Sequence, residues 1–95
     1  MPFITRVELR NSAKEEDYNE LHRAMKQAGF TRTIEEGGKT YRLPTAEYNR
    51  SDGLTIQKVL SRAKAAALST NLEYGILVVE YVNHKCEGLE EVRWP

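Results

Sequence analysis

Residues 3–30, FITRVELRNSAKEEDYNELHRAMKQAGF, decide the fold class, because a strand pattern is followed directly by a helix pattern. Over residues 3–10, apolar and polar side chains alternate, which is typical of a strand with one buried face. An apolar stripe with helical spacing follows, made of Tyr18, Leu21, Met25 and Ala28. This stretch therefore predicts a strand that leads into an amphipathic helix.

The ends of this first helix also have sequence signals. Ser12, with Glu15 three residues later, predicts an N-cap with a capping box. Gly29 is the expected residue just beyond the C-terminal end, because glycine tolerates the left-handed backbone found there. Both signals agree with a helix between them.

The middle of the chain predicts a β-hairpin followed by a loop. Residues 31–35 and 39–43 flank the turn residues Glu36, Gly37 and Gly38, and Pro44 ends the second strand. Residues 45–53, TAEYNRSDG, are rich in turn formers and predict a loop, in which Tyr48 is expected to point inward.

The second half repeats the helix-then-strand order. Thr55 is the expected N-cap of a helix whose apolar stripe is Ile56, Val59, Leu60, Ala63 and Ala67. Residues 74–82, YGILVVEYV, are the most hydrophobic stretch and predict the last strand. Residues 83–95 have no clear period and are expected to form a polar C-terminal tail.

The predicted order is therefore β-α-β-β-α-β, an α+β fold. Right-handed crossovers place both helices on one face of a four-stranded antiparallel sheet, with strand order 4-1-3-2. This arrangement is a ferredoxin-like sandwich over residues 1–82, followed by the tail. The expected core consists of Phe3, Val7, Leu9, Leu21, Met25, Ile34, Tyr41, Val59, Leu60, Ala63, Ile76 and Val78.

Composition limits the function classes. The 95 residues fit one domain, and the balance of 14 basic against 14 acidic residues argues against a histone-like or polybasic partner but not against a local basic patch. The single cysteine excludes an internal disulfide, and no apolar run approaches the about 20 residues of a membrane helix. We expect a cytoplasmic protein without a membrane partner.

Motifs of metal, cofactor and nucleophilic sites are missing from the sequence. His22, His84 and Cys86 are the only nitrogen and sulfur ligands of the usual kind, and a zinc site needs four ligands. No Gly-rich phosphate loop or GxSxG elbow occurs. The sequence predicts no metal and no cofactor.

Local positive charge is the remaining signal. Residues 22–42 hold five Lys or Arg against two Glu, and residues 49–70 hold four against one Asp. Lys58 and Arg62 share one face of the second helix at a spacing of four residues. Such clusters bind phosphates, although basic side chains on solvated helix faces are also ordinary.

The predicted sheet gathers a second set of cations on its outer face. Strands one and three are neighbours in the expected order, so Arg6, Arg10 and Arg42 are expected to lie together there and to contact RNA phosphates. Glu8 on the same face is the candidate proton acceptor, or else it forms salt bridges with these arginines. His22 has a suitable pKa for acid–base work but is expected on a helix across the sheet, so it is left out of the site.

Several segments together resemble a known family. RVEL at residues 6–9, DYNELHRAMKQAGFTRTI at 17–34, TYRLPTAEY at 40–48 and YGILVVE at 74–80 look like small bacterial proteins grouped with the GhoS endoribonuclease antitoxins of type V toxin–antitoxin systems. The resemblance covers about residues 3–81. It implies a ferredoxin-like fold, related to that of the small nuclease subunit of CRISPR adaptation complexes.

The resemblance also implies an antitoxin that binds RNA and cleaves the messenger RNA of a small membrane-damaging toxin. The CRISPR relatives carry an aspartate at the end of strand one, where this chain has Glu8-Leu9-Arg10-Asn11. We therefore expect cleavage without a metal ion, through attack of the 2′-hydroxyl on its own phosphate.

Two further expectations concern protein partners. A non-catalytic protein-binding module of a small regulatory system is the alternative function. A homodimer is also expected, because the last strand lies at the edge of the predicted sheet, and either this edge or the tail is available for pairing.

Overall fold

The computed structural model describes residues 2–93, which form two helices and two antiparallel sheets. In chain order the elements are β1 (Pro2–Leu9), α1 (Glu15–Gln27), β2 (Thr33–Glu36), β3 (Lys39–Arg42), β4 (Glu47–Ser51), α2 (Ile56–Leu68) and β5 (Tyr74–Glu80). The predicted α+β class is confirmed. Within the described residues, neither helix has the length and apolar character needed to cross a membrane.

β1 is the central strand of a three-stranded sheet with the order β4-β1-β5. Thr5 in β1, for example, lies opposite Tyr48 in β4 and Val78 in β5. Because successive side chains of a strand point to opposite faces, every second residue of β1 is buried. These residues are Phe3, Thr5, Val7 and Leu9.

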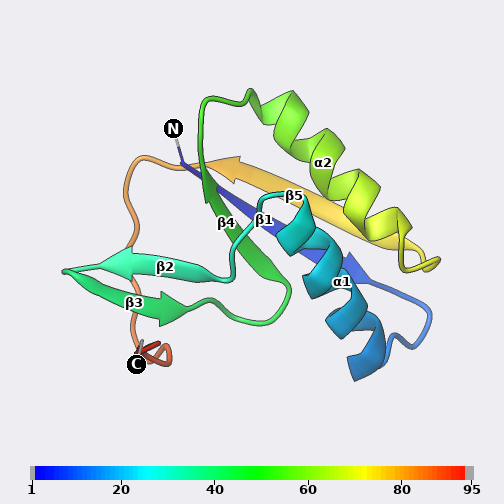
Figure 1. Ribbon diagram of the computed structural model, residues 1–95, viewed down its shortest axis with the longest axis horizontal. Helices are drawn as coiled ribbons and strands as arrows, with labels where there is room; N and C mark the ends of the chain where they lie inside the picture. The colour runs from blue at the N-terminus through cyan, green and yellow to red at the C-terminus, as the bar shows by residue number, and fades with distance from the viewer. Residues whose placement is uncertain (1, 94–95) are drawn as a thin grey trace.

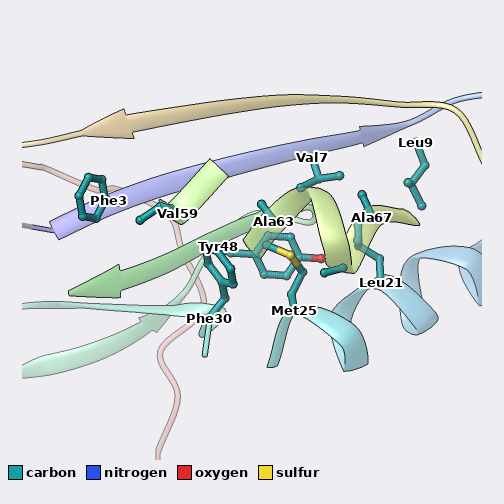
Figure 2. Packing of buried hydrophobic residues seen from close by; sticks show 11 residues of the cluster. Phe3, Val7, Leu9, Leu21, Met25, Phe30, Tyr48, Val59, Ala63 and Ala67 are labelled. Atoms are coloured by element: carbon teal, nitrogen blue, oxygen red, sulfur yellow. The ribbon is translucent and has the colours of Figure 1, made fainter. Parts of the chain in front are cut away.

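Both helices cover the buried face of this sheet (Figure 1). From α1, Leu21 and Met25 are buried, and α2 contributes Val59, Ala63, Ala66 and Ala67. These side chains converge on the buried side chains of β1 (Figure 2). Full burial of one large apolar side chain stabilises a fold by about 1.5–3 kcal/mol, so this layer is the main source of stability.

The prediction of one four-stranded sheet is wrong. β3 does not pair with β1, and β4, within the segment predicted to be a loop, pairs with β1 instead. β2 and β3 form a separate two-stranded sheet, joined to β4 by the isolated bridge between Thr31 and Asn49. The inward position of Tyr48 is confirmed, since 1% of its surface is exposed.

The predicted hairpin is present as β2 and β3 (Figure 1). Its turn residues Gly37 and Gly38 have φ values of +60° and +79°, the left-handed region that favours glycine. The C-terminal segment lies along the other edge of β3. The Arg42 N–H donates to the Glu90 carbonyl (2.8 Å), and the Val92 N–H donates to the Thr40 carbonyl (2.8 Å).

The helix ends agree only partly with the predictions. Thr55 caps α2, because its hydroxyl accepts the Lys58 N–H (3.3 Å). Ser12 does not cap α1, so that prediction is wrong: the N-cap is Lys14, whose N–H donates to the Asp17 carboxylate (2.8 Å). Asn11 and Ser12 instead have φ values of +61° and +59°, which place them in the turn between β1 and α1.

Most of the predicted core is confirmed. Leu60 is the clear error, since 39% of its surface is exposed. Tyr41, Ile76 and Val78 are half-buried, and the last two pack against the main cluster. The buried members of the prediction are Phe3, Val7, Leu9, Leu21, Met25, Ile34, Val59 and Ala63.

Candidate functional site

A cleft of about 490 Å³ is lined by α1, by the segment that follows α1 and the start of β2, and by β3 and β4. Its lining consists of His22, Arg23, Lys26, Phe30, Thr31, Arg32, Thr33, Arg42 and Tyr48. Four of these residues are cationic and none is acidic, although the chain as a whole is neutral. The cleft is therefore a local concentration of positive charge.

The acidic partners of these cations lie outside the cleft or are missing. Arg23 pairs with Glu20 (2.7 Å), and Arg42 lies 3.9 Å from Glu90. Within residues 2–93, Lys26 and Arg32 form no ion pair with an acidic residue. The Nε of Arg32 is buried and has no hydrogen-bond partner there. A buried donor without an acceptor costs free energy, which an anionic ligand would relieve.

The local folding explains why these cations meet. On α1, His22 and Lys26 lie one turn apart and therefore share a face. The hairpin register places Arg42 opposite Thr33, next to Arg32 in the chain. The Leu43 N–H donates to the Arg32 carbonyl (2.7 Å), which fixes the end of β3 beside the segment that follows α1.

That segment is also fixed to β4. Thr31 and Asn49 exchange two backbone hydrogen bonds of 2.8 Å each. The Asn49 side-chain amide donates to the Thr33 carbonyl (3.2 Å). Backbone pairing on both sides therefore holds Arg32 in place before any ligand binds.

His22 and Tyr48 form a hydrogen-bonded pair in the wall of the cleft. Nδ1 of His22 lies 2.6 Å from the Tyr48 hydroxyl, and the two ring centroids are 5.7 Å apart. Burial, followed by the nearby charge of Arg32, lowers the pKa of His22 below 6.5. Burial raises the pKa of Tyr48 well above 10. At neutral pH the pair is therefore an uncharged imidazole and an uncharged phenol.

The cations and the neutral His22 together suit an anionic ligand that carries an exchangeable proton near the anion. Guanidinium groups bind phosphate with parallel hydrogen bonds, and a Lys ammonium adds a point charge. Because Tyr48 occupies Nδ1 of His22, the other ring nitrogen, Nε2, is left for a ligand: it is an acceptor if Nδ1–H donates to the Tyr48 oxygen and a donor if the Tyr48 hydroxyl donates to Nδ1. Phe30 and Tyr48 are 3% and 1% exposed, so neither offers a surface on which a base would stack.

The structure separates the residues predicted to form one site on the sheet face. Arg42 lies in the cleft, whereas Arg6 and Glu8 lie on the face of the sheet opposite the helices. Arg10 follows β1, and its Nε binds Glu8 (3.0 Å), so Glu8 forms the salt bridge that was the alternative to a proton acceptor. The expected meeting of Arg6, Arg10 and Arg42 is wrong, because β4 rather than β3 lies beside β1.

Lys58 and Arg62 are exposed on α2, one turn apart as predicted. Neither lines the cleft. They therefore form a separate basic surface on the second helix.

The cleft contains four basic or titratable residues that the sequence did not assign to a site: His22, Arg23, Lys26 and Arg32. The signal was the excess of basic residues over residues 22–42. The sequence places His22 on a helix across the sheet from the arginines and so leaves it out of the site, but His22 and Arg42 line the same cleft. The hairpin position therefore decides the composition of the site.

No group of three or more His, Cys, Asp or Glu residues is placed to hold a metal ion within residues 2–93. The remaining candidate ligands contact the hairpin instead. His84 Nε2 lies 2.9 Å from the Glu35 carbonyl oxygen, and the Cys86 thiol donates to the Glu36 carboxylate (3.3 Å). Burial raises the pKa of Cys86, so this residue is a neutral thiol.

Comparisons with known proteins do not identify the chain: no family model, no curated protein and no solved structure matches it.

Proposed function

We propose that this protein binds RNA and that the cleft between α1 and the β2–β3 hairpin holds the RNA phosphates. The observation that carries this proposal is the presence of four cations without one acidic residue in the cleft wall of a neutral chain. The buried, unpartnered Nε of Arg32 supports it. Because the two aromatic rings of the cleft are buried, binding is directed at the sugar–phosphate backbone.

We further propose that the protein is a cytoplasmic, GhoS-like antitoxin that cleaves toxin messenger RNA without a metal ion. In the proposed fold relationship, β4 is the third strand of a ferredoxin-like sheet, and the segment around Thr31 begins the second. The β2–β3 hairpin is then an addition that completes the cleft.

The cleavage step assigns a role to His22. In the tautomer whose Nδ1–H donates to the Tyr48 oxygen, Nε2 of His22 has a free lone pair. The 2′-hydroxyl gives its proton to this nitrogen, and its oxygen forms a bond to the adjacent phosphorus. The bond from phosphorus to the 5′-oxygen breaks, and water protonates the leaving oxygen. The products are a 2′,3′-cyclic phosphate and a 5′-hydroxyl. Arg32 and Arg42 stabilise the additional negative charge of the transition state.

The binding proposal is tested with pairs of variants that remove equal charge from different surfaces. Each pair is titrated with a labelled single-stranded RNA at several salt concentrations, after circular dichroism has confirmed folding. We expect R32A/R42A to weaken binding at least tenfold and to reduce the salt dependence, because fewer counterions are released. The matched controls K58A/R62A and R6A/R10A are expected to change binding less than threefold.

Equal losses in all three pairs would mean that charge alone attracts the RNA. A loss of RNA affinity confined to R6A/R10A would place the RNA-binding site on the outer face of the sheet. Either result would contradict the cleft.

The cleavage proposal has a separate test. Wild-type protein is incubated with RNA and EDTA, and the products are analysed for 2′,3′-cyclic phosphate ends. We expect H22A to abolish cleavage but to retain RNA binding, whereas H84A is expected to cleave normally. Full cleavage by H22A would exclude His22 as the proton acceptor, and no cleavage by the wild type would leave an RNA-binding protein only.

A non-catalytic protein-binding module remains the second candidate. The observation that favours it is the apolar surface of α2 and β5, where Leu60 and Leu77 are 39% and 60% exposed. The dependence of binding affinity on salt concentration distinguishes the two functions. RNA binding weakens steeply as salt rises, whereas binding through an apolar protein interface changes little.

A further inference from the structure

Exposed large apolar side chains are confined to one part of the molecule. Within residues 2–93 they all lie on α2, on β5 or just after β5: Ile56, Leu60, Leu68, Leu77, Val79 and Val82. α2 lies over β5 at the margin of the sheet (Figure 1). An apolar concentration of this kind marks an interaction surface.

The backbone at this margin has unpaired hydrogen-bonding groups. The Arg10 N–H donates to the Glu73 carbonyl (2.9 Å), and the Tyr81 N–H donates to the Pro2 carbonyl (3.0 Å), so odd-numbered residues of β5 face β1. In an antiparallel ladder, the alternate residues then direct their N–H and C=O groups away from that partner. Along β5 these are Tyr74, Ile76, Val78 and Glu80, and no described strand lies beyond them.

We propose that β5 of a second copy of this chain pairs with this edge in antiparallel orientation, around a two-fold axis at Leu77. In this register Ile76 pairs with Val78 and Tyr74 with Glu80 of the other copy, so all outward backbone groups find partners. The two Leu77 side chains face each other on the outer face of the sheet. The three-stranded sheet becomes a six-stranded sheet across the dimer.

The charge distribution selects the antiparallel orientation. Glu80 is the only charged residue of β5. Antiparallel pairing around Leu77 keeps the two Glu80 carboxylates about 20 Å apart along the strand, whereas in-register parallel pairing would place them side by side. Within the dimer, each Glu80 lies opposite a tyrosine, whose phenol is a hydrogen-bond donor.

The edge also lacks most of the features that keep edge strands monomeric, since its only charge on the helix-facing side is Glu80 at its end. Such strands are usually short or carry lysine, proline or an inward charge. β5 has seven residues, YGILVVE, with neither lysine nor proline. On α2, which packs on β5, the exposed Ile56 and Leu60 add apolar surface. The proposal is independent of RNA binding, because the cleft lies beyond β4 at the other side of the sheet.

The test is the mass of the full chain by light scattering and sedimentation at tens of micromolar. We expect a species of twice the 10.9-kDa chain mass. L77K and L77E are each expected to be monomeric, because like charges then meet at the axis, and both remain folded since Leu77 is 60% exposed. A mixture of the two variants is expected to form the dimer again, since opposite charges then face each other.

A second pair of variants tests the backbone pairing. E80P removes an outward N–H without affecting the ladder to β1, and we expect it to raise the dissociation constant at least tenfold. E80A keeps this N–H and is expected to remain dimeric. A monomeric wild type, dimeric L77K and L77E, or no association in their mixture would each overturn the proposal; the first result would assign the surface to a different protein.

Discussion

Arg50 is the only charged residue that is buried within residues 2–93. Its Nη1 donates to the Ala28 carbonyl at the end of α1 (3.0 Å), and its Nη2 binds Asp52 (2.6 Å). The guanidinium carbon also lies 4.7 Å from the centre of the Phe30 ring. This one side chain therefore connects β4 to the end of α1 and to the aromatic core.

We predict that R50A lowers the free energy of unfolding by about 2–4 kcal/mol, because the substitution leaves a cavity and an unpaired Ala28 carbonyl. Urea unfolding measures this loss. The control is R62A on the exposed face of α2, for which we expect a change within about 0.5 kcal/mol. Equal, small effects of both substitutions would show that Arg50 is not structural.

The role of Arg50 could not be predicted from the sequence. In TAEYNRSDG it is one polar residue among turn formers, and charged residues are rarely buried unless they are paired. Its partners Ala28 and Phe30 are 22 and 20 positions away in the chain, and Asp52 is two positions away. Ala46, Tyr48 and Arg50 are all buried on one face of the chain. Because one of the three is charged, the sequence does not show the apolar alternation that predicts a strand.

His22 is expected to titrate below pH 6.5 in the free protein. Because the unfolded chain binds this proton at a higher pH, stability is complete above pH 6.5 and decreases as the pH falls through the folded pKa. A phosphate in the cleft favours the imidazolium, so we predict that RNA binding raises the pKa of His22. NMR titration of the imidazole signals with and without RNA measures the shift, and His84, outside the cleft, is the control.

R32A removes a charge that lowers the pKa of His22, so this variant is expected to have a higher pKa in the free state. An unchanged pKa in R32A, or no shift on RNA binding, would contradict the described cleft.

At the scale of elements, strands and helices with a strong apolar period were predictable. β1, both helices, the hairpin and β5 follow their sequence patterns to within a few residues. β4 was missed, because its pairing with β1 depends on contacts from distant segments and not on its own composition. The position of β4 also determines which residues form the site. Because β4 rather than β3 lies beside β1, Arg42 lines the same cleft as His22.

The C-terminal segment is predicted to stabilise the hairpin. V92P removes the N–H that donates to the Thr40 carbonyl, and Pro is incompatible with that hydrogen bond. We expect faster amide hydrogen exchange for Arg42 and its neighbours in β3, with little change for Val7 in the central sheet. V92A keeps the N–H and serves as the control. Unchanged exchange in V92P would show that the hairpin is stable without this segment.

At the scale of the whole molecule, the proposed dimer through β5 predicts that stability depends on protein concentration. If folding and association are coupled, the Tm of the wild type rises with protein concentration, because the dimer is favoured by mass action. We predict that the Tm of the monomeric L77K variant is independent of concentration. Differential scanning calorimetry over a hundredfold range of concentration distinguishes the two, and a wild-type Tm that does not move would contradict the prediction.

The central position of β1 has a consequence for how the protein folds. Its two neighbours in the sheet are residues 47–51 and 74–80, so both ladders close long stretches of chain. Such distant pairing slows folding, because the entropy of loop closure must be lost before the ladder forms. As a ribosome makes the chain, Phe3, Val7 and Leu9 emerge before both of their strand partners, and they gain the second partner only after residue 80. During this interval the nascent chain exposes an apolar strand, and that is the period in which a chaperone would bind it.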